Sequence, residues 1–156
     1  MRPVTPDTGT LLALGASTFL AAMLIAIAIL DLRTRRIPDT FSLPLAGAGL
    51  GWTAWIDPPA LPSHLLGALI GYASLAAFGA VYFHKRGREG LGLGDAKLFA
   101  AGGAWIGWQS LPLVLLTASV SGLLYAFATR RLRADEHLAF GPWIALGIWI
   151  GWLASR

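Results

Sequence analysis

Two aspartates in this sequence stand at the edges of long apolar runs, where a carboxylate is costly unless it is paired, solvated or used. Asp31 follows the uncharged run 8–30, and Asp95 stands just ahead of the uncharged run that begins at Leu98. Two carboxylates that lie close together cannot both ionise easily, so one holds a proton while the other takes a proton from water. Aspartic proteases hydrolyse peptide bonds with this arrangement. The pair therefore predicts general acid–base chemistry, provided that the fold brings the two side chains together.

Both aspartates also have purely structural interpretations. Asp95 follows Gly92 and Gly94, which let the backbone turn tightly, and precedes Ala-Lys-Leu, a pattern typical of a helix N-cap. Asp31 would pair with Arg35, one helical turn further on, or be hydrated at the membrane interface. If the two aspartates react instead, the helix ends separate their roles, because a C-terminal end disfavours an anion and an N-terminal end favours one. Asp95 is then the candidate base and Asp31 the candidate acid.

The composition places both aspartates in an integral membrane protein. The chain of 156 residues is 56% hydrophobic and 13% charged, whereas soluble domains carry about 25% charged residues. This length predicts a single domain, residues 1–156. The sequence has no cysteine, which excludes disulfides, thiol catalysis and cysteine metal sites.

Uncharged runs predict the helices that position the aspartates, because a membrane span needs about 20 apolar residues. The runs are 8–30, 40–56, 65–83, 98–129 and 138–155. Run 98–129 is longer than one span, and Gln109, Ser110 and Pro112 offer a turn that divides it. We therefore predict an all-α fold, a polytopic bundle of six transmembrane helices.

The fourth predicted helix is short. From Asp95 to Trp108 it has 14 residues, which reach about 21 Å, less than the ~30 Å of a bilayer core. We expect it to begin below the membrane surface, so that Asp95 lies in a water-accessible recess walled by protein. The glycine pairs Gly47/Gly51 and Gly67/Gly71 predict close packing between neighbouring helices.

Basic residues predict the orientation of the bundle. Ten of the 12 Lys and Arg residues fall in the loops after the first, third and fifth predicted helices. The positive-inside rule puts these loops in the cytoplasm and both termini outside, so both aspartates lie on the cytoplasmic side. The basic charge is therefore a topology signal and a contact for anionic lipids, and we expect no nucleic-acid partner.

At the two aspartates the sequence resembles the type IV prepilin leader peptidases, a family of membrane aspartic peptidases. The family's first pattern is an Asp that ends a membrane helix, followed by Ile/Leu-Pro-Asp/Asn, here Asp31 and then Ile37-Pro38-Asp39. Its second pattern is Gly-x-Gly-Asp-x-Lys-Leu, here residues 92–98. A third similarity is Phe-Gly-Pro at 140–142, which opens the last predicted helix.

The resemblance implies that Asp31 and Asp95 are the catalytic aspartates. It also implies that Gly92, Gly94 and Lys97 shape the loop that brings Asp95 in, whereas we interpret Asp39, after Pro38, as a turn residue or an N-cap of the second helix. The family cleaves a short basic leader from prepilin or pseudopilin precursors at the cytoplasmic face of the bacterial inner membrane. Larger members also N-methylate the new N-terminus through an extra N-terminal region, and we expect this chain to be a peptidase without methyltransferase activity.

Two other functional classes stay open. A small proton-coupled transporter would relay protons through both aspartates, although transporters usually carry such acids near the bilayer midplane and show internal repeats. A non-catalytic component of a pilus or secretion assembly system would tolerate Asp-to-Asn changes at both sites. The zinc-protease pattern His-Glu-x-x-His is absent and the histidines, His64 among them, stand singly at helix boundaries, so we expect no metal and no cofactor. The sequence leaves the oligomeric state undetermined.

Overall fold

The computed structural model describes residues 8–87, 92–129 and 139–155. These residues form six α-helices and two single 3₁₀ turns, and no strand occurs within these three ranges. The prediction of an all-α bundle with six helices is confirmed. The helices are α1 (Thr8–Thr34), α2 (Asp39–Ile56), α3 (Leu61–Arg86), α4 (Leu93–Ile106), α5 (Leu111–Ala128) and α6 (Gly141–Ala154).

Three segments of the described chain are long and apolar enough to cross a membrane: Thr8–Thr34, Pro58–Lys85 and Trp108–Ala128. They correspond to α1, to α3 and to α5, the latter two with the 3₁₀ turns that precede them. The other three helices are shorter, with 18 residues in α2 and 14 each in α4 and α6. These three segments thus alternate along the chain with the shorter helices α2, α4 and α6.

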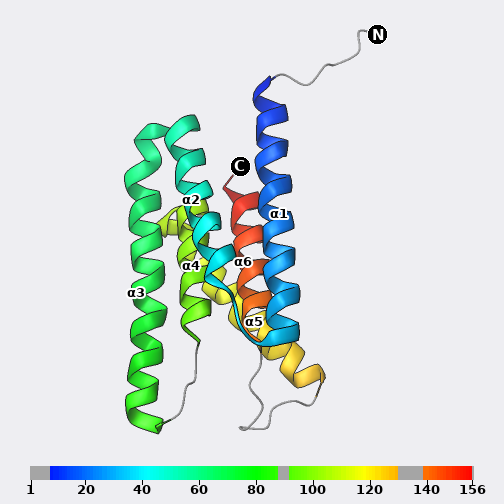
Figure 1. Ribbon diagram of the computed structural model, residues 1–156, viewed down its shortest axis with the longest axis vertical. Coiled ribbons are helices and arrows are strands. Elements are labelled where there is room, and N and C mark those ends of the chain that lie inside the picture. Colours follow the sequence, from blue (N-terminus) through cyan, green and yellow to red (C-terminus); the bar gives the residue numbers. More distant parts are fainter. Residues whose placement is uncertain (1–7, 88–91, 130–138, 156) are drawn as a thin grey trace.

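Helix α4 lies in the middle of the bundle (Figure 1), with α2 and α3 on one side and α6 on the other. Apart from Ala100, every residue from Leu98 to Ile106 is buried. A helix that is apolar all round must be surrounded by protein or lipid, and here α2, α3, α5 and α6 all contact it. The length of 14 residues agrees with the prediction, although the helix begins and ends two residues earlier.

The break between α4 and α5 occurs where the sequence predicted it. Gly107 ends α4 with a φ of 73°, a left-handed backbone conformation that glycine adopts without steric cost. A 3₁₀ turn over Trp108–Ser110 follows, and Pro112 stands in the first turn of α5, where its missing N–H is not needed. The 32-residue uncharged run is therefore two helices.

Glycines set the distance between α3 and α4. A Cβ added at Gly67 would lie 2.5 Å from the Gly103 carbonyl oxygen, and one added at Gly71 would lie 3.1 Å from the Phe99 carbonyl oxygen. The two backbones therefore touch, and the prediction of close packing at Gly67/Gly71 is confirmed. Close approach of this kind is the usual role of small residues between membrane helices.

The same prediction for Gly47/Gly51 is wrong, because nothing lies within 4 Å of a Cβ added at either position. Both glycines are on the exposed side of α2. The packed position is Gly49, where an added Cβ would lie 2.6 Å from the ring of Trp105. The indole nitrogen of Trp105 also donates a hydrogen bond of 2.8 Å to the Leu45 carbonyl oxygen. One large side chain of α4 therefore fills the space that Gly49 leaves.

His64, which the sequence places at a helix boundary, makes hydrogen bonds inside the bundle. Its ring nitrogen Nδ1 lies 3.0 Å from the Ala104 carbonyl oxygen and 3.1 Å from Thr53 Oγ1. The half-buried imidazole of α3 is thus hydrogen-bonded to the ends of α2 and α4 that lie farthest from Asp95.

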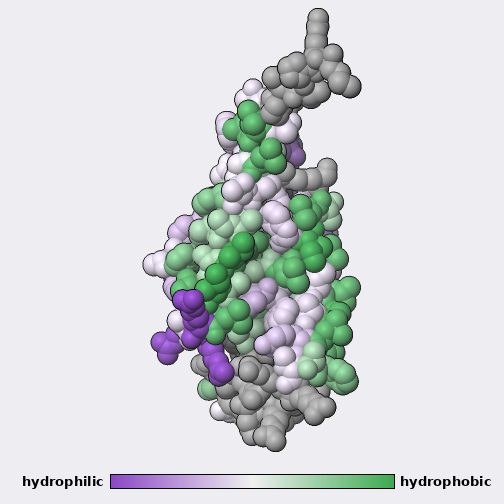
Figure 2. Space-filling model, turned by 90° about the vertical axis from the view of Figure 1, so that its right-hand side faces the viewer, coloured by the Kyte–Doolittle hydropathy of each residue, from purple (hydrophilic) through white to green (hydrophobic). Residues whose placement is uncertain are grey.

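Polar side chains gather at the opposite end of the molecule. In Figure 1, α1 and α3 end there, and α2, α4 and α6 begin there. Figure 2, the same molecule turned by 90°, shows apolar side chains over much of the exposed surface and strongly hydrophilic ones near this end. The residues that follow Asp31 include the exposed Arg33, Arg35 and Arg36. Both aspartates of interest belong to this end.

Candidate active site

Asp31 is buried in the last turn of α1. The helix continues to Thr34, beyond the end of the uncharged run, and the carboxyl-bearing residue is only 5% exposed. Its Oδ2 accepts a hydrogen bond of 3.0 Å from the backbone N–H of Gly141. Gly141 is the first residue of α6, so this N–H has no partner within its own helix and is free to bind a carboxylate. The carboxylate partner of Asp31 is therefore Gly141 rather than Arg35.

Asp95 lies in the first turn of α4, but the prediction that it is the N-cap is wrong. The N-cap is Gly92, and Asp95 is the third residue of the helix. From that position its carboxylate accepts a hydrogen bond from the backbone N–H of Gly92. This is the reach-back contact of a capping box, with glycine in place of the usual Ser or Thr. Asp95 therefore provides a hydrogen-bond acceptor for a backbone N–H at the start of its own helix. Its side chain is only partly buried.

Ile37 is the side chain around which the two aspartate segments meet. It is 8% exposed and packs on glycines of two other segments. A Cβ added at Gly94, next to Asp95, would lie 3.0 Å from Ile37 Cβ. A Cβ added at Gly141 would lie 3.0 Å from Ile37 Cδ1 and 2.7 Å from Asp31 Oδ2. Both glycines are thus required by close approach, and any larger residue would push the segments apart.

The carboxyl groups of Asp31 and Asp95 lie close enough to interact electrostatically. The fold therefore unites the two segments that the sequence singled out, one at the end of α1 and one at the start of α4. Asp31 is buried, whereas Asp95 is partly exposed.

Asp39 and Lys97 form an ion pair that the sequence analysis did not foresee. Lys97 Nζ lies 2.6 Å from Asp39 Oδ1 and 2.7 Å from Oδ2. Asp39 begins α2 directly after its N-cap, Pro38, and its side chain makes no capping hydrogen bond, so the interpretation as a cap is wrong. The sequence did contain a signal for this pair, since Asp39 belongs to the first family motif and the oppositely charged Lys97 to the second. The pair ties the start of α2 to α4 beside the two aspartates.

Gly141 is another residue in contact with the aspartates that the residue-by-residue reasoning missed, although Phe-Gly-Pro had been noted as a family pattern. A glycine followed by proline at a helix start leaves an open N–H with no side chain over it, and here that N–H binds Asp31. The contact also removes the basis for assigning Asp31 as the acid and Asp95 as the base from the helix ends. Because Asp31 lies at the N-terminus of α6 and Asp95 at that of α4, the helix ends do not distinguish an acid from a base.

The described residues contain no group of three His, Cys, Asp or Glu side chains that could hold a metal ion. The polar groups around the two aspartates are backbone N–H groups and the Asp39–Lys97 pair.

Comparison with known proteins agrees with the two motifs. The model of the type IV leader peptidase family matches residues 18–127. The chain belongs to this family. The matched residues include Asp31, Asp39, Asp95 and Lys97, whereas Gly141 lies beyond them. The resemblance stated from the sequence is therefore confirmed.

Individual relatives carry a double name. The "Prepilin leader peptidase/N-methyltransferase" of Escherichia coli (strain K12) is 40% identical over 161 residues, which cover 99% of this chain and 68% of the relative. The protein of the same name from Burkholderia pseudomallei (strain K96243) is 41% identical, over 91% of this chain and 46% of the relative. That of Pectobacterium carotovorum subsp. carotovorum is 38% identical, over 87% and 50%. The chain thus spans about two thirds of the first relative and about half of the others. No solved structure matches the chain.

Proposed function

We propose that this chain is a membrane aspartic endopeptidase that removes the leader from type IV prepilin or pseudopilin precursors, with Asp31 and Asp95 as its catalytic pair. The observation that carries this proposal is that the two carboxyl groups lie at the same end of the bundle, close enough to interact electrostatically, and that each is hydrogen-bonded to a backbone N–H at a helix start. Two separate motifs supply them, and Ile37 packs between the segments.

The reaction needs only these two groups and water. The ionised carboxylate takes a proton from a water molecule as the water oxygen bonds to the carbonyl carbon of the scissile peptide. The protonated carboxyl group gives its proton to the peptide nitrogen, and the carbon–nitrogen bond then breaks. The Gly141 and Gly92 N–H groups orient the carboxylates, so that neither side chain has to be ordered during the reaction.

The site faces the cytoplasm in this proposal, with both termini of the chain outside and the bundle in the bacterial inner membrane. The exposed arginines that follow Asp31 support this orientation, because cytoplasmic segments near a membrane carry an excess of Lys and Arg and contact anionic lipids. The second activity in the relatives' name, N-methylation, is not assigned to these residues.

The decisive experiment is cleavage of a purified precursor by the purified membrane protein. Asp31→Asn and Asp95→Asn should each abolish cleavage while the protein still inserts, since the mechanism needs both carboxylates to move protons. Asp57→Asn is the matched control, because Asp57 is exposed at the far end of α2. Cleavage retained in either site variant, at equal protein level, would overturn the assignment. No cleavage by the unsubstituted protein would favour a transporter or an assembly component.

A further inference from the structure

A cavity at the end of the bundle opposite Asp95 has no part in the catalytic proposal. Its volume is about 470 Å³, and residues of α1, α2, α3, α4 and α6 line it. Three of the lining side chains are indoles, those of Trp52, Trp105 and Trp152, and we call this space the tryptophan cavity.

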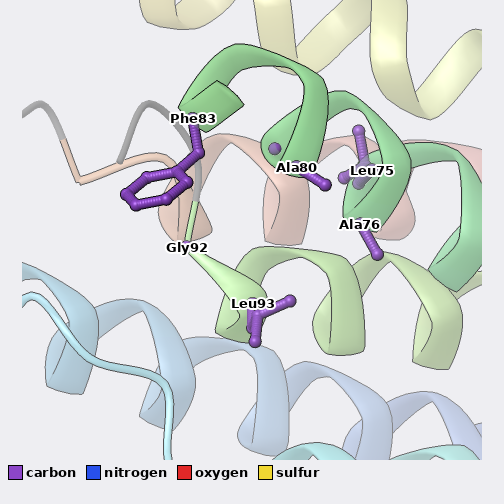
Figure 3. Close-up of a pocket in the computed structure, with 7 residues that line it drawn as sticks. Leu75, Ala76, Ala80, Phe83, Gly92 and Leu93 are labelled. Carbon is purple, nitrogen blue, oxygen red and sulfur yellow. The ribbon is translucent and has the colours of Figure 1, made fainter. Parts of the chain in front are cut away.

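The tryptophan cavity is separate from the candidate active site. A pocket of about 430 Å³ between α3 and the first turn of α4 has Gly92 in its wall (Figure 3), so it adjoins Asp95. A groove of about 220 Å³ between α1 and α6 begins at Pro142, next to the Gly141 that binds Asp31. Both spaces belong to the surroundings of the two aspartates, and the tryptophan cavity shares no lining residue with either.

Most hydrogen-bond donors in the wall of the tryptophan cavity are already in use. Four of them bind acceptors within the protein at 2.8–3.1 Å, namely the hydroxyl groups of Thr53 and Ser155 and the indole N–H groups of Trp105 and Trp152. Trp52 is the exception, because its indole N–H reaches no acceptor in the part of the chain that the structure describes. The wall therefore offers a ligand mainly acceptors.

His64 contributes one of these acceptors. Its Nδ1 lies 3.0 Å from the Ala104 carbonyl oxygen, which can only accept, so Nδ1 carries the proton of the neutral ring. Nε2 then has a free lone pair, and no donor of the described residues binds it. The Ser155 hydroxyl oxygen, whose proton goes to the Trp152 carbonyl oxygen, is a second acceptor. A ligand group with several N–H donors fits this wall.

Helix ends and aromatic rings favour a positive charge in the cavity. The last turns of α2, α4 and α6 line it, whereas only α3 begins there, and Figure 1 shows these three helices running toward the same end of the bundle. A helix C-terminus carries a partial negative charge, and indole faces attract cations. The exposed Asp57 adds a negative charge, and none of the described residues in the wall is a Lys or an Arg.

The surroundings of the cavity indicate that its ligand comes from the membrane. Trp55 and Ile56, in the last turn of α2, are 64% and 50% exposed. The Trp55 ring packs edge-on against Trp52, with ring centroids 6.1 Å apart. Exposed tryptophans at the end of a membrane helix are typical of the level of the lipid headgroups. A lipid whose acyl chains lie against these side chains can place its headgroup in the cavity.

We propose that the tryptophan cavity binds the primary ammonium group of a phospholipid with a phosphoethanolamine headgroup. The ammonium group donates to His64 Nε2 and to Ser155, and the Trp52 N–H serves an oxygen of the adjacent phosphate. A trimethylammonium group has the same charge but no N–H donor, and a glycerol headgroup has donors but no positive charge. The site goes beyond the peptidase function and depends neither on cleavage nor on which end of the bundle faces the cytoplasm.

Binding is measured as the shift in thermal unfolding of the purified protein in detergent. The probes are dioleoyl phosphatidylethanolamine and dioleoyl phosphatidylcholine, which differ only in the methyl groups on nitrogen. At about 100 times its Kd, the ethanolamine lipid should raise the midpoint by about 5 °C or more, and the choline lipid by less than half as much. Soluble glycerophosphoethanolamine at the same concentration should give no shift, because it has no acyl chains. A full shift with this compound would refute a lipid as the ligand.

Two variants of the wall have matched controls. Trp52→Leu removes a lining indole, and Trp55→Leu removes the neighbouring indole, which does not line the cavity. His64→Asn keeps an N–H donor near the position of Nδ1 but has no counterpart of Nε2, and His84→Asn changes an exposed histidine at the other end of α3. Each shift is taken from the lipid-free midpoint of the same variant. Trp52→Leu and His64→Asn should reduce the difference between the two lipids at least twofold, and the controls should keep it.

Two results would overturn the site. One is an equal or larger shift with the choline lipid in the unsubstituted protein, a comparison that needs no variant to fold. The other is an undiminished difference between the lipids in Trp52→Leu and His64→Asn. If only one of these two variants folds, that variant decides. None of these results affects the peptidase proposal, which depends on its own cleavage experiment.

Discussion

The Asp39–Lys97 ion pair joins the two segments that carry the aspartates, so breaking it should displace Asp95 from Asp31. Lys97 follows Asp95 by two residues in α4, and Asp39 follows Ile37, which packs on Gly94. We predict that Lys97→Met and Asp39→Asn each lower kcat/KM for a precursor, chiefly through kcat, while the protein still inserts. A small displacement of a catalytic group affects the chemical step more than binding.

The magnitude follows from the exposure of the pair. The side chains of Lys97 and Asp39 are 27% and 55% exposed, and exposed ion pairs contribute about 0.2–1 kcal/mol. The amine contacts both carboxylate oxygens, at 2.6 and 2.7 Å, which favours the upper end of that range. If about 1 kcal/mol of positioning is lost, the rate falls about fivefold. This is far less than the complete loss expected if either of the two proposed catalytic aspartates, Asp31 or Asp95, is replaced by Asn.

A double-mutant cycle tests whether the two groups act as a pair. If they do, the variant with both Asp39→Asn and Lys97→Met should also lose about fivefold, because the second change has nothing left to break. Independent effects would multiply to about 25-fold, and that result would refute the positioning role. Asp57→Asn, which removes an exposed carboxylate at the other end of α2, should leave the rate unchanged. The fivefold losses should shrink at high salt, where an exposed pair is screened.

Two further predictions concern the bundle. Gly103→Ala should destabilise the protein by about 1–3 kcal/mol, because the new methyl group would meet the backbone of α3. Gly51→Ala is the control and should be neutral or slightly stabilising, because nothing lies near a methyl group at that position. Equal shifts of the two variants in thermal unfolding in detergent would contradict the contact between α3 and α4. A topology reporter fused after Gln109 should read outside and one fused after Arg88 inside, and an inside reading at Gln109 would contradict a turn at the outer surface between α4 and α5.

Local patterns in the sequence were sufficient to predict the helices and to single out the two aspartates. Uncharged runs and the turn at Gln109, Ser110 and Pro112 predict where helices begin and end, because burial in lipid and backbone conformation are properties of neighbouring residues. Asp31 and Asp95 could be recognised as unusual for the same reason, because a charge beside an apolar run is visible from neighbouring residues alone. The short fourth helix was also predicted, since its length is a count along the chain.

The tertiary structure decided which groups these residues meet. The bond from Gly141 to Asp31 links positions 110 residues apart, and the Asp39–Lys97 pair links positions 58 apart. No local periodicity encodes such contacts, because they depend on how α6, α2 and α4 pack around each other. Asp39 therefore looked like a cap and proved to be half of an ion pair, and Gly47 looked like a packing site and proved to be exposed. The sequence determined which residues stand at the membrane edge, and the packing of α4 among its neighbours determined that they form one site.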